Sequence, residues 1–343
     1  DMTYRADDKR YDTMQYRRTG HSGLKLPAIS LGLWQNFGGT RDYPGAFEIL
    51  GHAFDNGITH FDLANNYGPP PGAAEELFGQ VLARDFKPYR DELIVSSKAG
   101  WRMWPGPYGD WGSRKYIIAS ADQSLKRTGL DYFDIFYHHR YDKQTPLEES
   151  MGALAQLHRQ GKALYVGISS YHEDDTRKAA AILKEMGVPL LIHQPSYSIL
   201  NRWIEDDNTI GACAELGVGM IAFSPLAQGV LSGKYSSRAK RPEGSRAADK
   251  NTSLSDKALA PNVLKAVDAL EAVAKKRKQT LVQLALSWVL RRPEVTSALI
   301  GVRTLEQLKD CLGAVNAAPL TPAELKAIDA AAKPGMLDQR PSW

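Results

Sequence analysis

Three polar residues stand where successive apolar, strand-like runs give way to polar loops. They are Asp62, Lys98 and His139, and Tyr67 follows Asp62 in the loop ANNYG. In a parallel barrel every strand delivers its C-terminal end to one rim, so groups far apart in sequence converge there. The spacing therefore predicts a catalytic mouth that holds a carboxylate, a phenol, an ammonium group and an imidazole.

These residue types suit proton transfer to a carbonyl oxygen. A tyrosine hydroxyl has a pKa near ~10 in model peptides, and we expect Lys98, held by a buried carboxylate, to lower the pKa of Tyr67. Tyr67 is then a general acid, while His139 orients or polarises the same oxygen. The set contains no nucleophile and no metal site. Hydride from a reduced nicotinamide is the natural agent to attack the carbonyl carbon.

Each residue also has a purely structural interpretation. An isolated Asp62 or Lys98 at a strand end can be a loop ligand or a solvated charge, and Tyr67 can be a turn aromatic. His138 and His139 are adjacent, so on a strand they point to opposite faces and at most one lines the mouth. A barrel hydrolase or aldolase that uses Lys98 as a Schiff base remains a further alternative.

The elements that would position these groups are eight short runs rich in β-branched and aromatic residues. They are residues 28–34, 58–64, 92–98, 133–139, 163–169, 190–196, 219–225 and 297–302. Helical periodicity separates them, and several helical stretches close on a glycine suited to a left-handed cap, namely Gly57, Gly129, Gly161, Gly187 and Gly217. The alternation predicts an α/β fold, a (β/α)8 TIM barrel. A doubly wound sheet is less favoured because the first strand leads into LWQNFGG rather than a phosphate-binding glycine motif.

The 343 residues, 43% of them hydrophobic, suffice for one large barrel. We expect a single domain over residues 14–331 with an N-terminal β-hairpin (MQYRR, then LKLPA), an N-terminal extension over 1–13 and a C-terminal tail over 332–343. The polar stretch 236–257 is predicted to form a mobile loop on the catalytic face.

Charge and cysteine content narrow the function class. The net charge is +4, but Lys and Arg are spread among almost as many acids, which argues against nucleic-acid binding. The sequence contains no run of 18 consecutive apolar residues, so it predicts no membrane-spanning helix. Cys213 and Cys311 are too few for a disulfide framework or a structural zinc site, so we predict a cytoplasmic protein without a metal.

Several motifs carry a resemblance to a known family. The order and spacing of GITHFDLANNYG, IVSSKAG, DYFDIFYHHR, ALYVGISSY, IAFSPLAQGVLSGKY and ALIGVRTLEQL resemble the aldo-keto reductase superfamily over residues 14 to about 330. WPGPYG, HQPSYSILNRW and SPLAQG look like the branch that contains bacterial L-glyceraldehyde-3-phosphate reductases and potassium-channel β subunits, with the reductases closest.

The resemblance implies Asp62, Tyr67, Lys98 and His139 as a catalytic tetrad, with His139 selected because it lies five places after Asp134. Channel β subunits have asparagine there, so the histidine favours a working reductase. It also implies NADPH as the cofactor, bound by Trp34, Asp62, Ser169, Ser170, Gln194, Phe223, Ser224, Pro225, Leu226, Gln228, Gly229, Lys234, Gly301, Arg303 and Gln307.

The last part of this set can also be interpreted physically. Thr304 and Gln307 form a predicted capping box at a helix start, with Arg303 just before it, and helix N-termini with an adjacent guanidinium bind phosphate. This favours NADPH over NADH. The alternative for Arg303 is a surface loop arginine. Relatives differ at Asp310 and Cys311, so their roles stay open.

The expected substrate is a small aldehyde resembling L-glyceraldehyde 3-phosphate or methylglyoxal, in a pocket of Trp34, Tyr67, Trp101, His139 and Arg140. Rim packing is the alternative for the tryptophans, Trp104 included, and pairing with a structural acid is the alternative for Arg140. The branch implies a homo-oligomer. A channel-β-like regulatory subunit that binds cofactor with little turnover is the alternative function.

Overall fold

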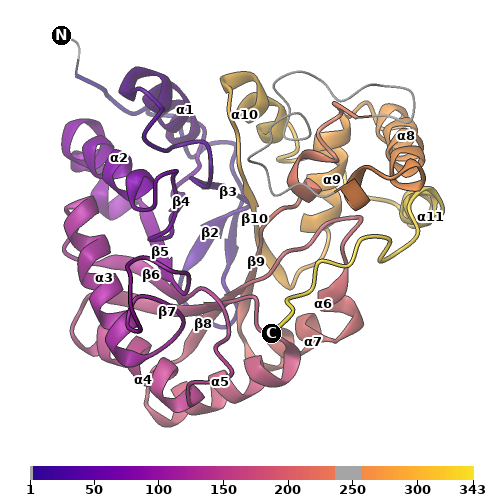
Figure 1. Ribbon diagram of the computed structural model, residues 1–343. Coiled ribbons are helices and arrows are strands. Elements are labelled where there is room, and N and C mark those ends of the chain that lie inside the picture. The colour runs from indigo at the N-terminus through magenta and orange to yellow at the C-terminus, as the bar shows by residue number, and fades with distance from the viewer. Residues whose placement is uncertain (1–2, 236–255) are drawn as a thin grey trace.

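The centre of the molecule is a closed barrel of eight parallel strands in the order β10-β3-β4-β5-β6-β7-β8-β9 (Figure 1). This computed structural model describes residues 3–235 and 256–343. The barrel strands are β3 (Ile29–Gly32), β4 (His60–Asp62), β5 (Ile94–Ala99), β6 (Phe133–His138), β7 (Ala163–Ser169), β8 (Leu190–Gln194), β9 (Gly219–Ala222) and β10 (Val295–Ile300). Each lies within or overlaps a predicted run, so the (β/α)8 prediction is confirmed.

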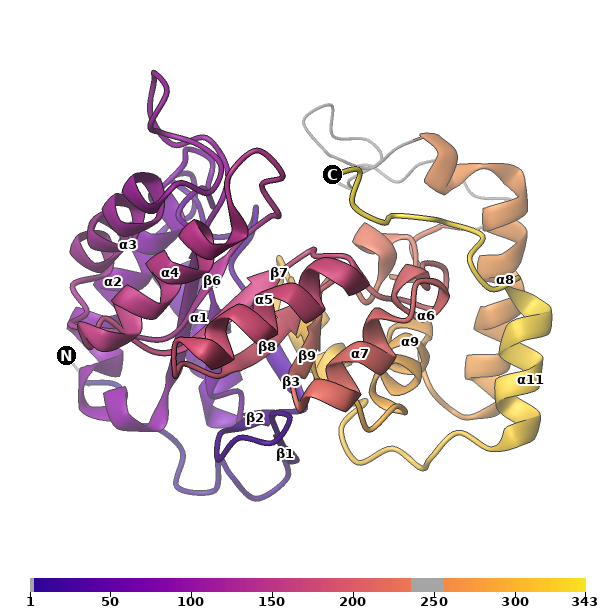
Figure 2. The ribbon, with the colours of Figure 1, turned by 90° about the horizontal axis from the view of Figure 1, so that it is seen from below.

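Helices form a ring outside the barrel, as Figures 1 and 2 show. They are α1 (Tyr43–Asp55), α2 (Ala73–Val81), α3 (Arg114–Thr128), α4 (Leu147–Arg159), α5 (Glu173–Glu185), α6 (Trp203–Asp206), α7 (Thr209–Leu216), α8 (Pro261–Lys276), α9 (Leu281–Leu290), α10 (Leu305–Leu312) and α11 (Pro322–Ala331). Because helices cover the outside and side chains fill the inside, the strands are buried on both faces.

Glycine ends several helices as predicted. Gly57, Gly129, Gly161, Gly187 and Gly217 all have positive φ. At Gly217, which caps α7, φ is +69° and an added Cβ would lie 2.4 Å from His21 Nδ1. Both the backbone conformation and the space at this position therefore exclude a larger residue.

The N-terminal hairpin closes the end of the barrel opposite the mouth. It consists of β1 (Tyr16–Arg18) and β2 (Lys25–Pro27), paired antiparallel, and Figure 2 shows it below the barrel strands. Leu26 is fully buried and joins the interior apolar cluster of Ile135, Ile192 and Ile221. The predicted hairpin is thus confirmed, and its apolar residue seals the base of the barrel.

The chain after α11 returns to the barrel mouth. In Figure 1 the yellow C-terminal segment runs from α11 back toward the barrel strands and ends near β8. Most of the polar stretch predicted as a mobile loop, residues 236–255, lies outside the described residues. Within the described ranges, no helix has both the length and the apolar character needed to span a bilayer.

Candidate active site

The structure brings the four strand-end groups together. Lys98, on β5, donates hydrogen bonds from Nζ to Asp62 Oδ2 and, over 2.8 Å, to the carbonyl oxygen of Leu63. The Asp62 and Lys98 side chains are fully buried. Lys98 Nζ lies 5.0 Å from the centre of the Tyr67 ring, and the Tyr67 and His139 rings are 6.1 Å apart, edge to face. The carboxylate and ammonium therefore form a buried pair behind a phenol and an imidazole.

The electrostatics of Tyr67 differ from the sequence-based expectation. Burial raises the pKa of Tyr67 well above its ordinary value, and the charge of Asp62 raises it further. The net lowering predicted from Lys98 is wrong, because burial and the charge of Asp62 outweigh the stabilisation that the Lys98 ammonium gives to a tyrosinate. Tyr67 is consequently a neutral phenol, the form that can give a proton away.

His139 is a neutral imidazole at the cavity wall. Burial holds its pKa well below the usual range, and the charges of Lys98 and Arg140 act in the same direction. Its Nδ1 atom is buried and has no hydrogen-bond partner among the described residues. A neutral imidazole beside the phenol can orient a carbonyl oxygen by hydrogen bonding without adding charge.

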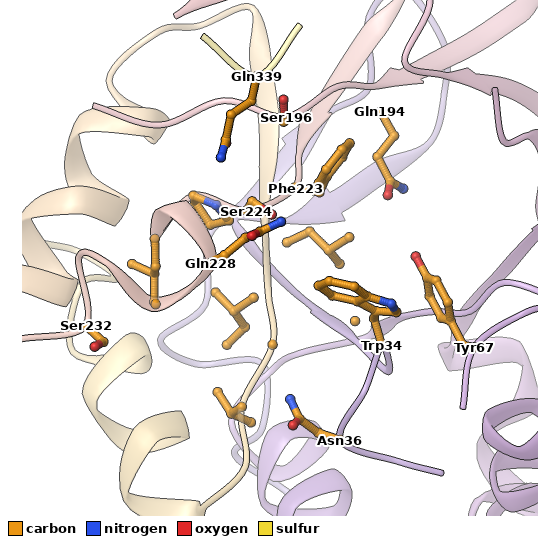
Figure 3. Close-up of a pocket in the computed structure, with 18 of the residues that line it drawn as sticks. Trp34, Asn36, Tyr67, Gln194, Ser196, Phe223, Ser224, Gln228, Ser232 and Gln339 are labelled. Carbon is orange, nitrogen blue, oxygen red and sulfur yellow. The ribbon is translucent and has the colours of Figure 1, made fainter. Parts of the chain in front are cut away.

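Tyr67 and His139 line a cavity of about 660 Å³ at the mouth of the barrel. Figure 3 shows Trp34, Tyr67, Gln194, Phe223 and Gln228 around it. Every residue predicted to bind the cofactor lines it except Asp62, which is buried behind the wall: the lining includes Trp34, Ser169, Ser170, Gln194, Phe223, Ser224, Pro225, Leu226, Gln228, Gly229, Lys234, Gly301, Arg303 and Gln307.

One wall of the cavity has an unusual backbone. After β9, Ser224, Ala227 and Gln228 have positive φ values of 49°, 51° and 57°. Non-glycine residues rarely adopt this left-handed region, and a run of them bends the chain sharply around the space in front of it. The strained segment therefore follows the wall of the cavity, where Ser224 and Gln228 are among the lining residues.

Two residues predicted to bind an anion, Arg303 and Gln307, line the side of the cavity next to α10. Thr304 caps α10 by accepting a hydrogen bond from the Gln307 backbone N–H, but the Gln307 side chain accepts from the Arg303 N–H at 2.7 Å. Half of the predicted capping box is therefore present, because the glutamine reaches one residue further back. Arg303 Nε donates to Asn36 Oδ1 at 3.1 Å, and Asn36 Nδ2 is buried without a partner among the described residues.

Asp310 and Cys311 also line this side. The Asp310 carboxylate accepts a hydrogen bond from Thr280 at 2.7 Å, which ties it to the neighbouring helix. Burial raises the pKa of the Cys311 thiol to about 12, so this group is an uncharged part of the wall.

Part of the cavity wall is aromatic. Trp34, Tyr67, Trp101 and His139 line it as predicted. Trp104 does not, and packs against Tyr116 with ring centres 5.5 Å apart, which supports rim packing for this tryptophan.

Arg140 is absent from the cavity wall within the described residues. Its guanidinium carbon lies between the rings of Trp101 and Trp111, 3.9 and 3.5 Å from their centres, and it pairs with Asp110. Placing Arg140 in the substrate pocket is therefore corrected: its cation is already satisfied by two rings and a carboxylate, and the structural role left open for it is the one the contacts favour.

The C-terminal tail supplies wall residues that the sequence did not point to, namely Gln339, Pro341 and Trp343. Trp343 Nε1 donates to the Ser170 carbonyl oxygen at 3.0 Å, and its ring lies 5.9 Å from that of Trp101. Asn36, Asn66 and Ser196 were missed as well. The only available signal for the tail was an isolated tryptophan in a polar segment.

Comparison with known proteins gives consistent matches. A model of the Aldo/keto reductase family matches residues 28–333. L-glyceraldehyde 3-phosphate reductase of Escherichia coli (strain K12) is 53% identical over 331 residues, which cover 96% of this chain and 95% of that protein. A probable voltage-gated potassium channel subunit beta of Arabidopsis thaliana is 34% identical over 318 residues, 92% of this chain and 96% of that protein.

Proposed function

The chain belongs to the aldo/keto reductase family and is an oxidoreductase; we propose that it reduces small aldehydes with NADPH, with Tyr67 as the proton donor. The observation that carries the proposal is the neutral, buried phenol of Tyr67 beside the Asp62–Lys98 pair at the wall of a large cavity. L-glyceraldehyde 3-phosphate and methylglyoxal are the aldehydes proposed as substrates, the first from the name of the 53% identical relative.

The charged and polar groups on the cavity wall support an extended dinucleotide phosphate as the ligand. Two cationic residues, Lys234 and Arg303, line it, and the buried Nδ2 atom of Asn36 is a donor without a partner among the described residues. The residues proposed to hold the cofactor are the cavity-lining ones named above, with Arg303 at the 2′-phosphate and Phe223 against the nicotinamide. When bound, the cofactor supplies the hydride.

The chain's own residues supply the proton and the electrostatic setting. Tyr67 donates from its hydroxyl to the carbonyl oxygen as negative charge develops there. The Lys98 ammonium, 5.0 Å from the ring centre, stabilises the tyrosinate that remains, and Asp62 keeps Lys98 in place. Since burial lowers the pKa of Lys98, the pairing with Asp62 is what preserves the ammonium. His139 orients the substrate oxygen.

The alternatives receive less support. Lys98 is fully buried, does not line the cavity and is held by Asp62, so a Schiff-base aldolase or hydrolase is disfavoured. A channel-β-like subunit with little turnover would share the fold and the cofactor site. His139 in the tetrad position favours turnover.

Proton donation is tested with Tyr67→Phe. NADPH oxidation is followed with glyceraldehyde 3-phosphate, methylglyoxal and an aromatic aldehyde, and the variant should lose at least ~100-fold in kcat. NADPH binding, measured by tryptophan fluorescence, should stay within about twofold. Unchanged turnover would exclude Tyr67 as the donor, and wild-type protein that binds NADPH without turnover would favour the regulatory subunit.

Cofactor choice is tested with Arg303→Ala. Loss of a charge-assisted contact with the 2′-phosphate should raise the KM for NADPH about tenfold or more and leave the KM for NADH nearly unchanged. NADH is the internal control. Equal losses for both cofactors would contradict the proposed contact.

We also propose that the protein is a cytoplasmic homo-oligomer. Both cysteines are buried and unpaired, which suits a reducing compartment. Light scattering on a sizing column checks the assembly, and a mass of about 38 kDa, that of one chain, would refute it.

A further inference from the structure

A chain of hydrogen-bonded polar side chains lies inside the barrel, behind Asp62. Ser96 Oγ donates to Asp62 Oδ1 at 2.6 Å, and His60 Nε2 lies 2.8 Å from Ser96 Oγ. His60 Nδ1 is 3.0 Å from Ser30 Oγ, which is 2.7 Å from Ser297 Oγ. All five side chains are fully buried. None of the four behind Asp62 has a part in the proposed proton transfer.

Strand geometry explains how this chain forms. His60 and Asp62 are two residues apart on β4, and Ser96 and Lys98 are two apart on β5, so each pair faces the barrel interior. The interior also holds an apolar cluster that includes Ile135, Ile192 and Ile221. Polar groups in such surroundings cost free energy unless they are hydrogen-bonded. Here they bond one another, and the chain ends on Asp62.

The directions of these hydrogen bonds determine the tautomer of His60. The Ser96 hydroxyl donates its one hydrogen to Asp62. Its oxygen must therefore accept a hydrogen bond from His60 Nε2–H. Burial lowers the pKa of His60 to about 4, and the charge of Lys98 acts in the same direction. The ring is therefore neutral at pH 7, and Nδ1 accepts from the Ser30 hydroxyl. Only the Nε2–H tautomer satisfies both contacts of the ring, and the single hydrogen of the Ser297 hydroxyl then goes either to Ser30 or to the Pro27 carbonyl oxygen, 2.6 Å away.

We propose that His60 is a positioning residue for aldehyde reduction, acting through Ser96 to hold the Asp62 carboxylate in the orientation that places the Lys98 ammonium behind Tyr67. The inference rests on the proposed function, in which Tyr67 is the proton donor.

The contacts of Asp62 show why the support matters. Its Oδ2 atom accepts a hydrogen bond from Lys98. Its Oδ1 atom accepts from Ser96 at 2.6 Å and from Gln194 Nε2 at 3.5 Å. Without the Ser96 bond, the long Gln194 contact is the one that remains at Oδ1 among the described residues. The carboxylate can then rotate, and the ammonium loses its fixed place 5.0 Å from the Tyr67 ring.

A looser pair also changes the pH at which Lys98 gives up its proton. The charged and titratable groups around Lys98 are Asp62, Glu75, His60, Tyr67, Tyr137 and His139. Burial lowers the pKa of Lys98, while Asp62 and then Glu75 oppose that shift. Weakening the contact with Asp62 therefore leaves burial less opposed. The fall of kcat at alkaline pH should begin at a lower pH.

The test uses His60→Leu and Ser96→Ala in the full chain with NADPH and methylglyoxal. Each variant should lose about tenfold in kcat, with the KM for NADPH within about twofold and the alkaline limb of the kcat profile moved to lower pH. His60→Gln should recover most of the loss, since its side-chain amide can donate to Ser96. Thr128→Val removes a buried hydroxyl that bonds a backbone carbonyl on α3, and is the matched control expected to match wild type.

The double variant shows whether His60 and Ser96 act through the same hydrogen-bonded chain or affect kcat independently. His60→Leu combined with Ser96→Ala should lose no more than the worse single variant, because both break the same chain. Multiplied losses would overturn the proposal, as would folded single variants with wild-type kcat and an unmoved alkaline limb.

Nitrogen NMR of the wild-type protein keeps the proposal testable if the variants do not fold. It should find His60 as the neutral Nε2–H tautomer, and the Nδ1–H form or an imidazolium at pH 7 would overturn it. If wild type fails to reduce any aldehyde, the proposed function fails separately, and the tautomer still decides whether the Asp62 support exists.

Discussion

Mild acid should destabilise this protein strongly, because several histidines are buried as neutral rings. His60, His138 and His193 are all hydrogen-bonded inside the molecule, with exposed fractions of 0%, 1% and 0%. Burial lowers their pKa values to about 4, about 4 and about 3. An unfolded chain binds these protons near pH 6.5.

The direction of the pH effect on the free energy of unfolding follows from proton binding to the two states. Between pH 6.5 and about 4 the unfolded state binds more protons than the folded state, so the free energy of unfolding falls as the pH falls. Above pH 6.5 all three rings are neutral in both states and contribute no pH dependence. From pH 7 to pH 5 each ring should cost ~2 kcal/mol, or ~6 kcal/mol together. Domains are typically stable by only ~5–15 kcal/mol, so most of the stability would be lost.

Urea unfolding followed by tryptophan fluorescence at pH 7, 6 and 5 measures this loss. His138→Gln retains a donor for the Trp111 carbonyl oxygen but cannot titrate, so it should lose ~2 kcal/mol less than wild type over the same range. Leu154→Ala, a buried apolar truncation, should lower stability equally at all three pH values. A wild-type free energy of unfolding at pH 5 within ~1 kcal/mol of that at pH 7 would refute the reasoning.

Three further changes probe the site and its support. Lys98→Met should cost ~3–5 kcal/mol in urea unfolding because it leaves Asp62 charged and buried, and adding Asp62→Leu should recover most of it; a double variant no more stable than the single one would contradict this. Arg140→Lys should lower the melting temperature but raise the aldehyde KM less than about threefold, since Arg140 stacks behind the wall. Gly112→Ala should cost ~1–3 kcal/mol by urea midpoint, because its Cβ would lie 2.8 Å from His138 Nε2.

The fold could be predicted from the chain because its signals are local. Strand runs such as AISLGLW are mostly apolar, as both faces of a barrel strand are covered, and the glycines after the helices mark their ends. Eight such runs in alternation with helices leave few other architectures. The convergence of Asp62, Lys98 and His139 followed from the same rule, since all parallel strands end at one rim.

The properties that depend on distant neighbours were predicted less well. The pKa of Tyr67 was expected to fall beside Lys98, but burial and the compensating Asp62 raise it. Arg140 directly follows the tetrad residue His139 in sequence. Its guanidinium nevertheless stacks on two tryptophans and pairs with Asp110 instead of lining the cavity. Neither the desolvation nor the partners of a side chain can be read from its neighbours along the chain.

The sequence by itself determined the eight-stranded barrel, the rim at which the tetrad meets and most of the wall proposed to hold a cofactor. Only the tertiary structure decided that Trp343 reaches Ser170 and Trp101, that Asn36 holds Arg303, and that His60 and Ser96 stand behind Asp62. The reason is physical. Periodicity along the chain records which face of an element is buried, whereas the side chains that meet across the barrel depend on strand register and closure.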